Sequence, residues 1–376
     1  TYEKDSQLTS IGRKAFSMQY EIWWDVEYFD YDSESKLTTL TVPEHVTTIG
    51  KSAFDNLTAL RYLNWNAIEC RDFEVHRGSI YSRTTVDGPF NKVEYATSTA
   101  GCKDGIIANF GSQVKKIPAA TFYGVSNLIS VSFGGGIGML NRVCESIGDY
   151  AFYGCTGLFD LSLPVTLKTI GAYAFYECFS LINLYIPSTL TTVGNNAFYC
   201  PKLVEICNDS SITIHVGGSQ TLEMNIYSSS SGSSKLFSYG MDGNDVYTFY
   251  QDGSTYYLMG TRDNTAHGLN LPQFVFKGNA KVSDTYIIHA YAFYGRNDDT
   301  IIISKPEAIA EIQSNAFNKI KNASVFFNGT AEKWNEMPRS FREALDSENT
   351  KYYYSETQPT EEGNFWRYYY GAIFIW

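Results

Sequence analysis

The sequence predicts a solenoid, an elongated and mainly β fold in which short repeated units stack and share one core. Three observations predict it: a hexad of constant shape, a constant distance between its copies, and a strand-like segment between them. One unit of this size cannot bury its apolar side alone, whereas stacked neighbours can. The chain has 376 residues, of which 44% are hydrophobic and 18% charged, so it has ample material for such a core.

The hexad Ile147-Gly148-Asp149-Tyr150-Ala151-Phe152 sets the phase of the repeat. Its last residue, an anchor Phe, recurs 23 residues later as Phe175 and again 23 residues later as Phe198. We expect Gly to supply an unusual backbone angle and Ala to allow close packing, so that the hexad turns the chain back. Hexads of this shape begin at Ile11, Ile49, Ile117, Ile147, Ile170, Val193, Ile288 and Ile312, and a degenerate copy ends at Phe90.

Between the hexads lies a segment with the alternation of a β-strand. In 158–164 it places Leu161 and Leu163 on one side and Asp160 and Ser162 on the other, and a proline then ends the strand. The same segment returns 23 residues later at 181–187. We therefore expect one parallel ladder that contains residues 160–163 and 183–186 and buries Leu161, Leu163, Leu184 and Ile186.

The combined pattern, LxxLxLPxxLxxIGxxAFxxC, resembles the BspA-type leucine-rich repeats of bacterial surface proteins. The resemblance covers most of 8–207 and returns at 286–328, and the segments 328–334 and 352–376 resemble the ends of such proteins from gut anaerobes. It implies a leucine-rich-repeat solenoid, a right-handed superhelix that is mainly β with short helical turns and a single parallel β-ladder of about eight or nine irregular repeats. It also implies secretion or surface display, and adhesion or binding to a host or bacterial surface protein or glycan.

Breaks in the period predict the organisation of the chain. Shorter interruptions lie at 17–36, 66–116 and 134–138, and a Ser/Gly-rich stretch with an Asp252-Gly253 hairpin signal marks the longest one. Near the end, Thr330 is placed to cap a short helix that Pro338 would stop. We expect leucine-rich repeats in 1–207, a β-hairpin insertion with a linker in 208–285, resumed repeats in 286–328, and a helix with an aromatic cap in 329–376.

Composition and charge narrow the classes of partner. The net charge of −11 argues against nucleic acid and against an anionic membrane surface, which both attract basic proteins. There is no run of about 18 apolar residues, so we expect no membrane insertion. The chain opens at Thr1 without a signal peptide, and we expect a mature, monomeric, secreted or surface-displayed chain from which that peptide has been removed.

Motifs that carry chemistry are absent or explained by the repeat, so we expect no enzyme, no catalytic or metal-binding residue and no cofactor. The five histidines show no ligand spacing. The glycine run 134–138 lacks the complete dinucleotide fingerprint and is interpreted as a turn. The segment 242–245 resembles part of a calcium loop but lacks the closing Glu, and is also interpreted as a turn. Cys155, Cys178 and Cys200 follow the anchor Phe closely and are expected to form an interior ladder of free thiols.

If the leucines face the core, alternation places a column of polar and aromatic side chains on the opposite side of the strands. We predict that this side binds the ligand and that Tyr185 is its main anchor, since a rigid ring buries much area at little entropic cost. Two alternatives remain open: a structural spacer that displays another domain, and a hydrolase site in 208–285. The predicted ligand face consists of Tyr62, Asn64, Ser130, Ser132, Asp160, Ser162, Asn183, Tyr185 and Glu205.

Overall fold

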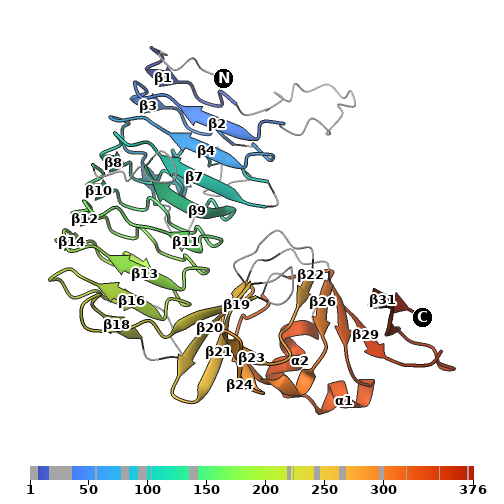
Figure 1. The fold of residues 1–376 in the computed structure, drawn as a ribbon. Helices are drawn as coiled ribbons and strands as arrows, with labels where there is room; N and C mark the ends of the chain where they lie inside the picture. Colours follow the sequence, from blue (N-terminus) through green and yellow to red (C-terminus); the bar gives the residue numbers. More distant parts are fainter. Residues whose placement is uncertain are drawn as a thin grey trace, which may run out of the picture. The chain divides into compact units, whose positions relative to one another are not determined.

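The computed structural model divides the chain into two compact units, Thr1–Ser233 (unit 1) and Ser234–Trp376 (unit 2) (Figure 1). The predicted loop at 17–36, except its last residue, the predicted turn at 242–245 and most of the glycine run 134–138 lie outside the described residues. The structure describes residues 7–16, 36–55, 57–77, 84–91, 100–102, 104–134, 143–217, 222, 224–240, 246–261, 268–294, 296, 300–318, 320–346, 348–370 and 372–376.

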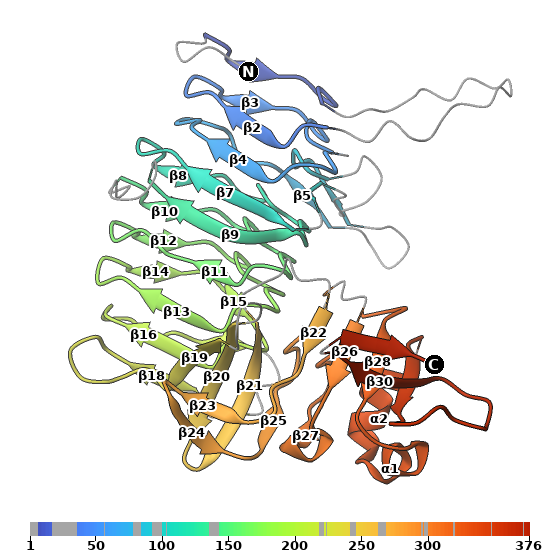
Figure 2. The same cartoon turned by 45° about the vertical axis from the view of Figure 1, so that its right-hand side comes forward.

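Unit 1 is a stack of turns whose strands form parallel ladders along its length (Figures 1 and 2). The first ladder includes the predicted strand at 160–163, but its middle strand, Ile106–Phe110, lies in the segment 66–116 that was predicted to interrupt the repeats. Its order is β11–β9–β7–β4–β2, and every pair in it is parallel, as expected. The strands are β2 (Thr39–Val42), β4 (Tyr62–Trp65), β7 (Ile106–Phe110), β9 (Leu128–Phe133) and β11 (Asp160–Leu161).

A second parallel ladder corrects the prediction of a single one. The first residue of each hexad in unit 1 and the residue before it are extended as well, because each turn of the chain passes along its neighbour twice. This ladder has the order β14–β12–β10–β8, and a separate pair joins β1 to β3. The strands are β1 (Ser10–Ile11), β3 (Thr48–Ile49), β8 (Lys116–Ile117), β10 (Ser146–Ile147), β12 (Thr169–Ile170) and β14 (Thr192–Val193).

The prediction that 160–163 and 183–186 share one ladder is also wrong. Strand β13 pairs with β16 and not with β11, so β11 is the end strand of its sheet. Leu161 on β11 is only half-buried, contrary to the prediction, whereas Leu163, Leu184 and Ile186 are buried as predicted. The remaining strands of unit 1 are β13 (Asn183–Ile186), β16 (Glu205–Asn208) and β18 (Asn225–Tyr227) in one parallel sheet, the parallel pair β15 (Phe198–Tyr199) and β17 (Val216–Gly217), and the antiparallel pair β5 (Val75–His76) and β6 (Thr85–Val86).

The anchor phenylalanines form the centre of the unit 1 core. Each ring contacts the ring of the next turn, with centroids 5.1–5.6 Å apart from Phe54 to Phe198. Phe90 fills the place between Phe54 and Phe122 and is fully buried, which confirms the degenerate hexad. The column is Phe54, Phe90, Phe122, Phe152, Phe175 and Phe198.

The hexads turn without helices in the described part of unit 1, contrary to the expectation of short helical turns. Instead, the fourth residue of each hexad adopts the left-handed conformation with φ between 54° and 62°. The hexad glycines do not have positive φ, so their expected role is wrong as well. A Cβ on Gly171 would lie 2.4 Å from the backbone nitrogen of Asp149, and glycine therefore provides room for the neighbouring turn. The left-handed residues are Lys14, Ser52, Ala120, Tyr150, Tyr173, Asn196, Tyr291 and Asn315.

Unit 2 begins with a meander that leads into further repeats. The hairpin predicted at Asp252-Gly253 is confirmed: β20 and β21 are antiparallel and Gly253 has φ of 57°. The first sheet has the order β19–β20–β21–β25–β27, with β21, β25 and β27 parallel. Its strands are β19 (Leu236–Gly240), β20 (Val246–Asp252), β21 (Thr255–Thr261), β25 (Tyr286–Ile288) and β27 (Ile309–Ile312), beside the antiparallel pair β23 (Val275–Lys277) and β24 (Ala280–Ser283).

The second sheet of unit 2 carries the end of the chain. The order is β22–β26–β28–β29–β30–β31, in which only the last pair is antiparallel. Phe293 and Phe317 stack 5.2 Å apart and continue the anchor motif within this unit. The strands are β22 (Gly268–Asn270), β26 (Thr300–Ile303), β28 (Ser324–Phe327), β29 (Thr350–Tyr354), β30 (Phe365–Tyr369) and β31 (Ala372–Ile375).

The described part of unit 2 also contains three short helices: a 3₁₀ helix, Pro306–Ala308, and the α-helices α1 (Ala331–Glu336) and α2 (Arg339–Asp346). The Thr330 hydroxyl accepts the Lys333 N–H at 3.2 Å, so the predicted cap is confirmed, and Pro338 separates the two α-helices. In the predicted aromatic cap, Trp366 is fully buried while Tyr370 is 94% exposed. Within the described residues, none of the helices is long and apolar enough to cross a membrane.

Candidate ligand-binding face

The outward side of the first ladder carries two columns of side chains, one residue per strand. We call them together the polar face. Parallel pairing sets their register, so residues from turns that are 23 to 45 positions apart in sequence lie side by side. The first column is Thr39, Tyr62, Ile107, Ser130 and Asp160; the second is Thr41, Asn64, Asn109 and Ser132.

Hydrogen bonds join the second column into a continuous chain. The Ser132 hydroxyl donates to Asn109 Oδ1 at 2.6 Å, and Asn109 Nδ2 donates to Asn64 Oδ1 at 3.3 Å. Asn64 Nδ2 in turn donates to the Thr41 hydroxyl at 3.4 Å. All four side chains are only partly buried. The chain of bonds fixes their orientation and leaves them accessible from one side.

The first column contributes a ring and a carboxylate. Tyr62 is 46% exposed, and the Arg61 guanidinium lies 5.9 Å from its ring centroid. Arg61 also donates to the carbonyl oxygens of Asp104 and Gly105, which holds the guanidinium beside the ring. Asp160 is exposed and accepts the Ser130 hydroxyl at 3.1 Å.

The structure therefore brings together five of the nine predicted ligand-face residues on one sheet. Ser162 lies just beyond β11 and is exposed, and Asn183 and Tyr185 are exposed on the separate sheet that begins with β13. The five residues on one sheet are Tyr62, Asn64, Ser130, Ser132 and Asp160.

Glu205 is a correction, because it is buried and not part of an accessible face. Its carboxylate accepts the Asn225 amide at 3.2 Å and the Tyr227 hydroxyl at 3.5 Å. Both partners lie on β18, a strand beyond the predicted end of the first array. Glu205 therefore joins β16 to β18.

Tyr185 makes a different contact from the one expected of a free anchor. Its hydroxyl donates to Asp209 Oδ2 at 3.1 Å, and the ring remains 41% exposed. The backbone N–H and the hydroxyl of Ser229 also bind Asp209, at 2.7 Å each, and hold the pKa of its carboxyl below the usual value. Tyr185 is thus oriented by a hydrogen bond and still presents its ring.

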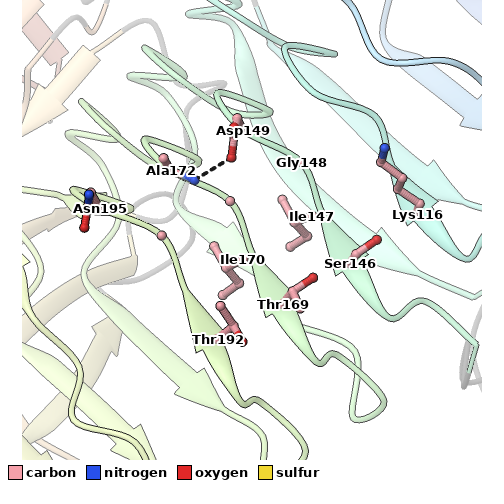
Figure 3. Close-up of a pocket in the computed structure, with 12 residues that line it drawn as sticks. Lys116, Ser146, Ile147, Gly148, Asp149, Thr169, Ile170, Ala172, Thr192 and Asn195 are labelled. Carbon is pink, nitrogen blue, oxygen red and sulfur yellow. Dashed lines mark hydrogen bonds between the residues drawn. The ribbon is translucent and has the colours of Figure 1, made fainter.

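The outer side of the second ladder is a groove of about 530 Å³ that the sequence reasoning missed. Its floor is the backbone of Gly148, Gly171 and Gly194, where closely packed turns leave no room for side chains. Figure 3 shows the hydroxyl-bearing residues Ser146 and Thr169 beside it on successive strands. The signal was present in the sequence as a Ser or Thr before the Ile-Gly or Val-Gly pair of the hexads.

A stack of tyrosines on the hexad turns was also missed. The rings of Tyr123, Tyr153, Tyr176 and Tyr199 lie 4.5–5.2 Å apart and nearly parallel. Partial burial raises the pKa of the first three hydroxyls. The signal was a Tyr directly after the anchor Phe in four successive turns. Because the rings cover one another's faces, mainly their edges and hydroxyls remain for contact.

The cysteine ladder is interior, as predicted, and its thiols have specific partners. Each donates to the carbonyl oxygen of the anchor Phe one turn earlier: Cys155 to Phe122, Cys178 to Phe152, and Cys200 to Phe175, at 3.1–3.4 Å. All seven cysteines are thiols. Burial raises the pKa of Cys155 and Cys178 well above the usual value, which makes them poor nucleophiles. The described residues contain no group of three or more His, Cys, Asp or Glu side chains that could hold a metal ion.

Comparisons with known proteins agree with this architecture. A family model described as BspA type leucine rich repeat region matches in six copies, over residues 26–74, 115–226 and 270–347, which is well over half of the chain. No curated protein matches the chain significantly.

Several solved structures match the chain. A leucine-rich cell surface protein from Faecalibacterium prausnitzii A2-165 has 17% identity and a TM-score of 0.31; the match covers 85% of this chain and 64% of that protein. The pneumococcal vaccine antigen PcpA has 15% identity and a TM-score of 0.29, over 93% of this chain and 60% of that one. A leucine-rich repeat protein from Bacteroides ovatus has 16% identity and a TM-score of 0.22, over 92% of both. The chain thus spans less than two thirds of the first of these proteins.

Proposed function

Because this chain belongs to the BspA-type leucine-rich-repeat family, we propose that it is a non-catalytic binding module, secreted or displayed at a cell surface. In this proposal the outward side of its strands recognises a surface ligand, a protein or a glycan. The repeats supply a rigid scaffold, and the ligand contacts side chains that the core does not need.

The observation that carries the proposal is the polar face. Its second column forms a hydrogen-bonded chain across four strands, and Tyr62 stands 46% exposed beside it. Side chains that are already ordered lose little entropy when a ligand binds, so a preorganised surface favours recognition. Exposed tyrosine with amide and hydroxyl neighbours is also the composition of many natural binding surfaces.

A role as an enzyme has less support. The cysteines of the interior ladder are buried, and their thiols are already hydrogen-bonded to backbone carbonyls.

Nucleic acid and anionic membranes also have less support as partners. An acidic chain with a net charge of −11 has little attraction for either.

Arrays of surface proteins and of glycans, probed with the intact chain, test the proposal. We expect a saturable ligand on at least one array. A chain that binds nothing on either array would contradict the proposal and favour a structural spacer that displays another domain. Release of product from a hydrolase substrate panel would contradict the non-catalytic part and point to the predicted 208–285 segment.

A further inference from the structure

The polar face contains almost no charge. Of its nine residues, Asp160 alone is charged, and it lies at one end, on the last strand of the sheet. Arg61 lies beside the face, where its guanidinium donates to two backbone carbonyl oxygens. Among the nine residues of the face itself, a ligand that carries sulfate, phosphate or carboxylate groups finds no cation to bind and one carboxylate that repels it.

The two asparagines present alternating donors and acceptors. In the hydrogen bonds of the described residues, Asn64 and Asn109 each use one N–H and accept one hydrogen bond. A primary amide has two N–H groups and two lone pairs on its oxygen. Each asparagine therefore keeps one N–H and one lone pair for a ligand. Neighbouring strands lie about 4.8 Å apart, which repeats this donor and acceptor pair along the ladder. Groups that both donate and accept, such as hydroxyls, match such a row.

An aromatic platform lies next to this row. Tyr62 and Asn64 are two residues apart on β4, so both point outward from the same strand. The Arg61 guanidinium lies beside the Tyr62 ring, and Tyr62 remains 46% exposed. A ring of this kind binds flat apolar surfaces, while the adjacent amide binds polar groups at the rim of the same ligand.

We propose that the polar face binds a neutral oligosaccharide. This inference rests on the proposed function and assigns a ligand class and a location to it. The C–H face of a sugar ring packs on Tyr62, and hydroxyls at the edge of the sugar pair with Asn64 and Asn109. A protein ligand is disfavoured here, because the centre of a protein interface is usually built from several apolar or aromatic anchors, and the polar face has only Tyr62 and the partly buried Ile107.

The test probes the intact chain with an array of neutral, sialylated and sulfated oligosaccharides, and then measures the affinity of each hit by calorimetry. We expect hits among the neutral glycans. Asn109→Ala removes the shared amide and should weaken binding by about tenfold or more, as the loss of hydrogen bonds to a preorganised group does. Tyr62→Ala should have an effect of similar size. Because Tyr62 is exposed, we expect Tyr62→Ala to keep the fold. This variant therefore still tests the inference if Asn109→Ala does not fold.

Tyr369→Ala is the matched control, since it removes a tyrosine of similar exposure from unit 2, outside the predicted ligand face. It should leave binding of the neutral glycan unchanged. Hits that are only sialylated or sulfated, or equal affinity of wild type, Asn109→Ala and Tyr62→Ala, would overturn the inference. If a protein array gives a partner and the glycan array gives none, the inference fails and the proposed function stands. If both arrays give nothing, both fail.

Discussion

The phenyl rings of Phe152 and Phe175 lie face to face, with their centroids 5.1 Å apart and their planes 6° from parallel. They come from equivalent positions in successive repeats, and Phe198 continues the stack at 5.6 Å. All three rings are fully buried. The 23-residue period of the sequence thus appears in the structure as a column of equivalent rings.

Truncation of the middle ring tests this column. Phe175→Ala should lower the free energy of unfolding by about 3–5 kcal/mol. The substitution opens a cavity between Phe152 and Phe198, and the packed turns around these rings limit how far they can move to fill it. Urea denaturation of the variant measures the loss. Val165→Ala, at a position 48% exposed in the same region, is the control and should change stability little. A loss below about 1 kcal/mol for Phe175→Ala would show that the column is not part of the core.

We predict that the hexad glycines are required because a side chain at these positions would collide with the backbone of the neighbouring turn. Gly171→Ala places a Cβ 2.4 Å from the backbone nitrogen of Asp149 and should destabilise unit 1 by about 1–3 kcal/mol, as overpacking does. Gly12→Ala is the matched control, since no atom of the described residues lies within 4 Å of its Cβ. Thermal melting compares the two variants. Equal melting temperatures would contradict the steric explanation.

Reactivity of the thiols should follow their burial. Cys155, Cys178 and Cys200 are fully buried, whereas Cys102 and Cys207 are partly exposed. We expect a small alkylating reagent near neutral pH to modify Cys102 and Cys207 first, and the three ladder thiols only after unfolding. Mass spectrometry of the modified peptides gives the order. Early modification of Cys178 in the folded chain would refute an interior ladder.

Alkaline pH should destabilise the protein through its buried thiols. Burial raises the pKa of Cys144 from 9.0 to about 12, so the folded chain keeps a proton that the unfolded chain releases. The resulting stabilisation is complete below pH 9 and is lost as the pH rises from 9 to 12, by about 1.4 kcal/mol per pH unit. Denaturation at a series of pH values should show a shallower decline for Cys144→Ala than for wild type. Identical slopes would argue against this origin.

The sequence was sufficient for the repeat, because identical residues at a constant distance identify equivalent positions. It did not predict the second ladder, since a pair such as Thr169-Ile170 is too short to show alternation. Alternation predicted which side of the strand Asn64 faces, but not its hydrogen bond with Asn109, 45 positions away. The segment between the two residues departs from the 23-residue period, so the register of their strands could not be predicted from the repeat length. Glu205 was misplaced because the strand that covers it lies beyond residue 207, where the repeats were predicted to end.

The central claim is that the ligand contacts the outward side of the first ladder or of β13 in unit 1. The most direct measurement is the affinity of a ligand found on the arrays for three folded variants. Tyr62→Ala alters the middle of the polar face, and Tyr185→Ala combined with Asp160→Ala alters two further residues of the predicted ligand face. Thr192→Ala, exposed on the second ladder, is the control.

We expect at least one of the first two variants to lose about tenfold or more in affinity, while Thr192→Ala binds as wild type does. Unchanged affinity in both ligand-face variants would contradict the claim. The binding site would then lie elsewhere, and the aromatic segment around Trp23 and Trp24 and the range 208–285 would be the next regions to substitute.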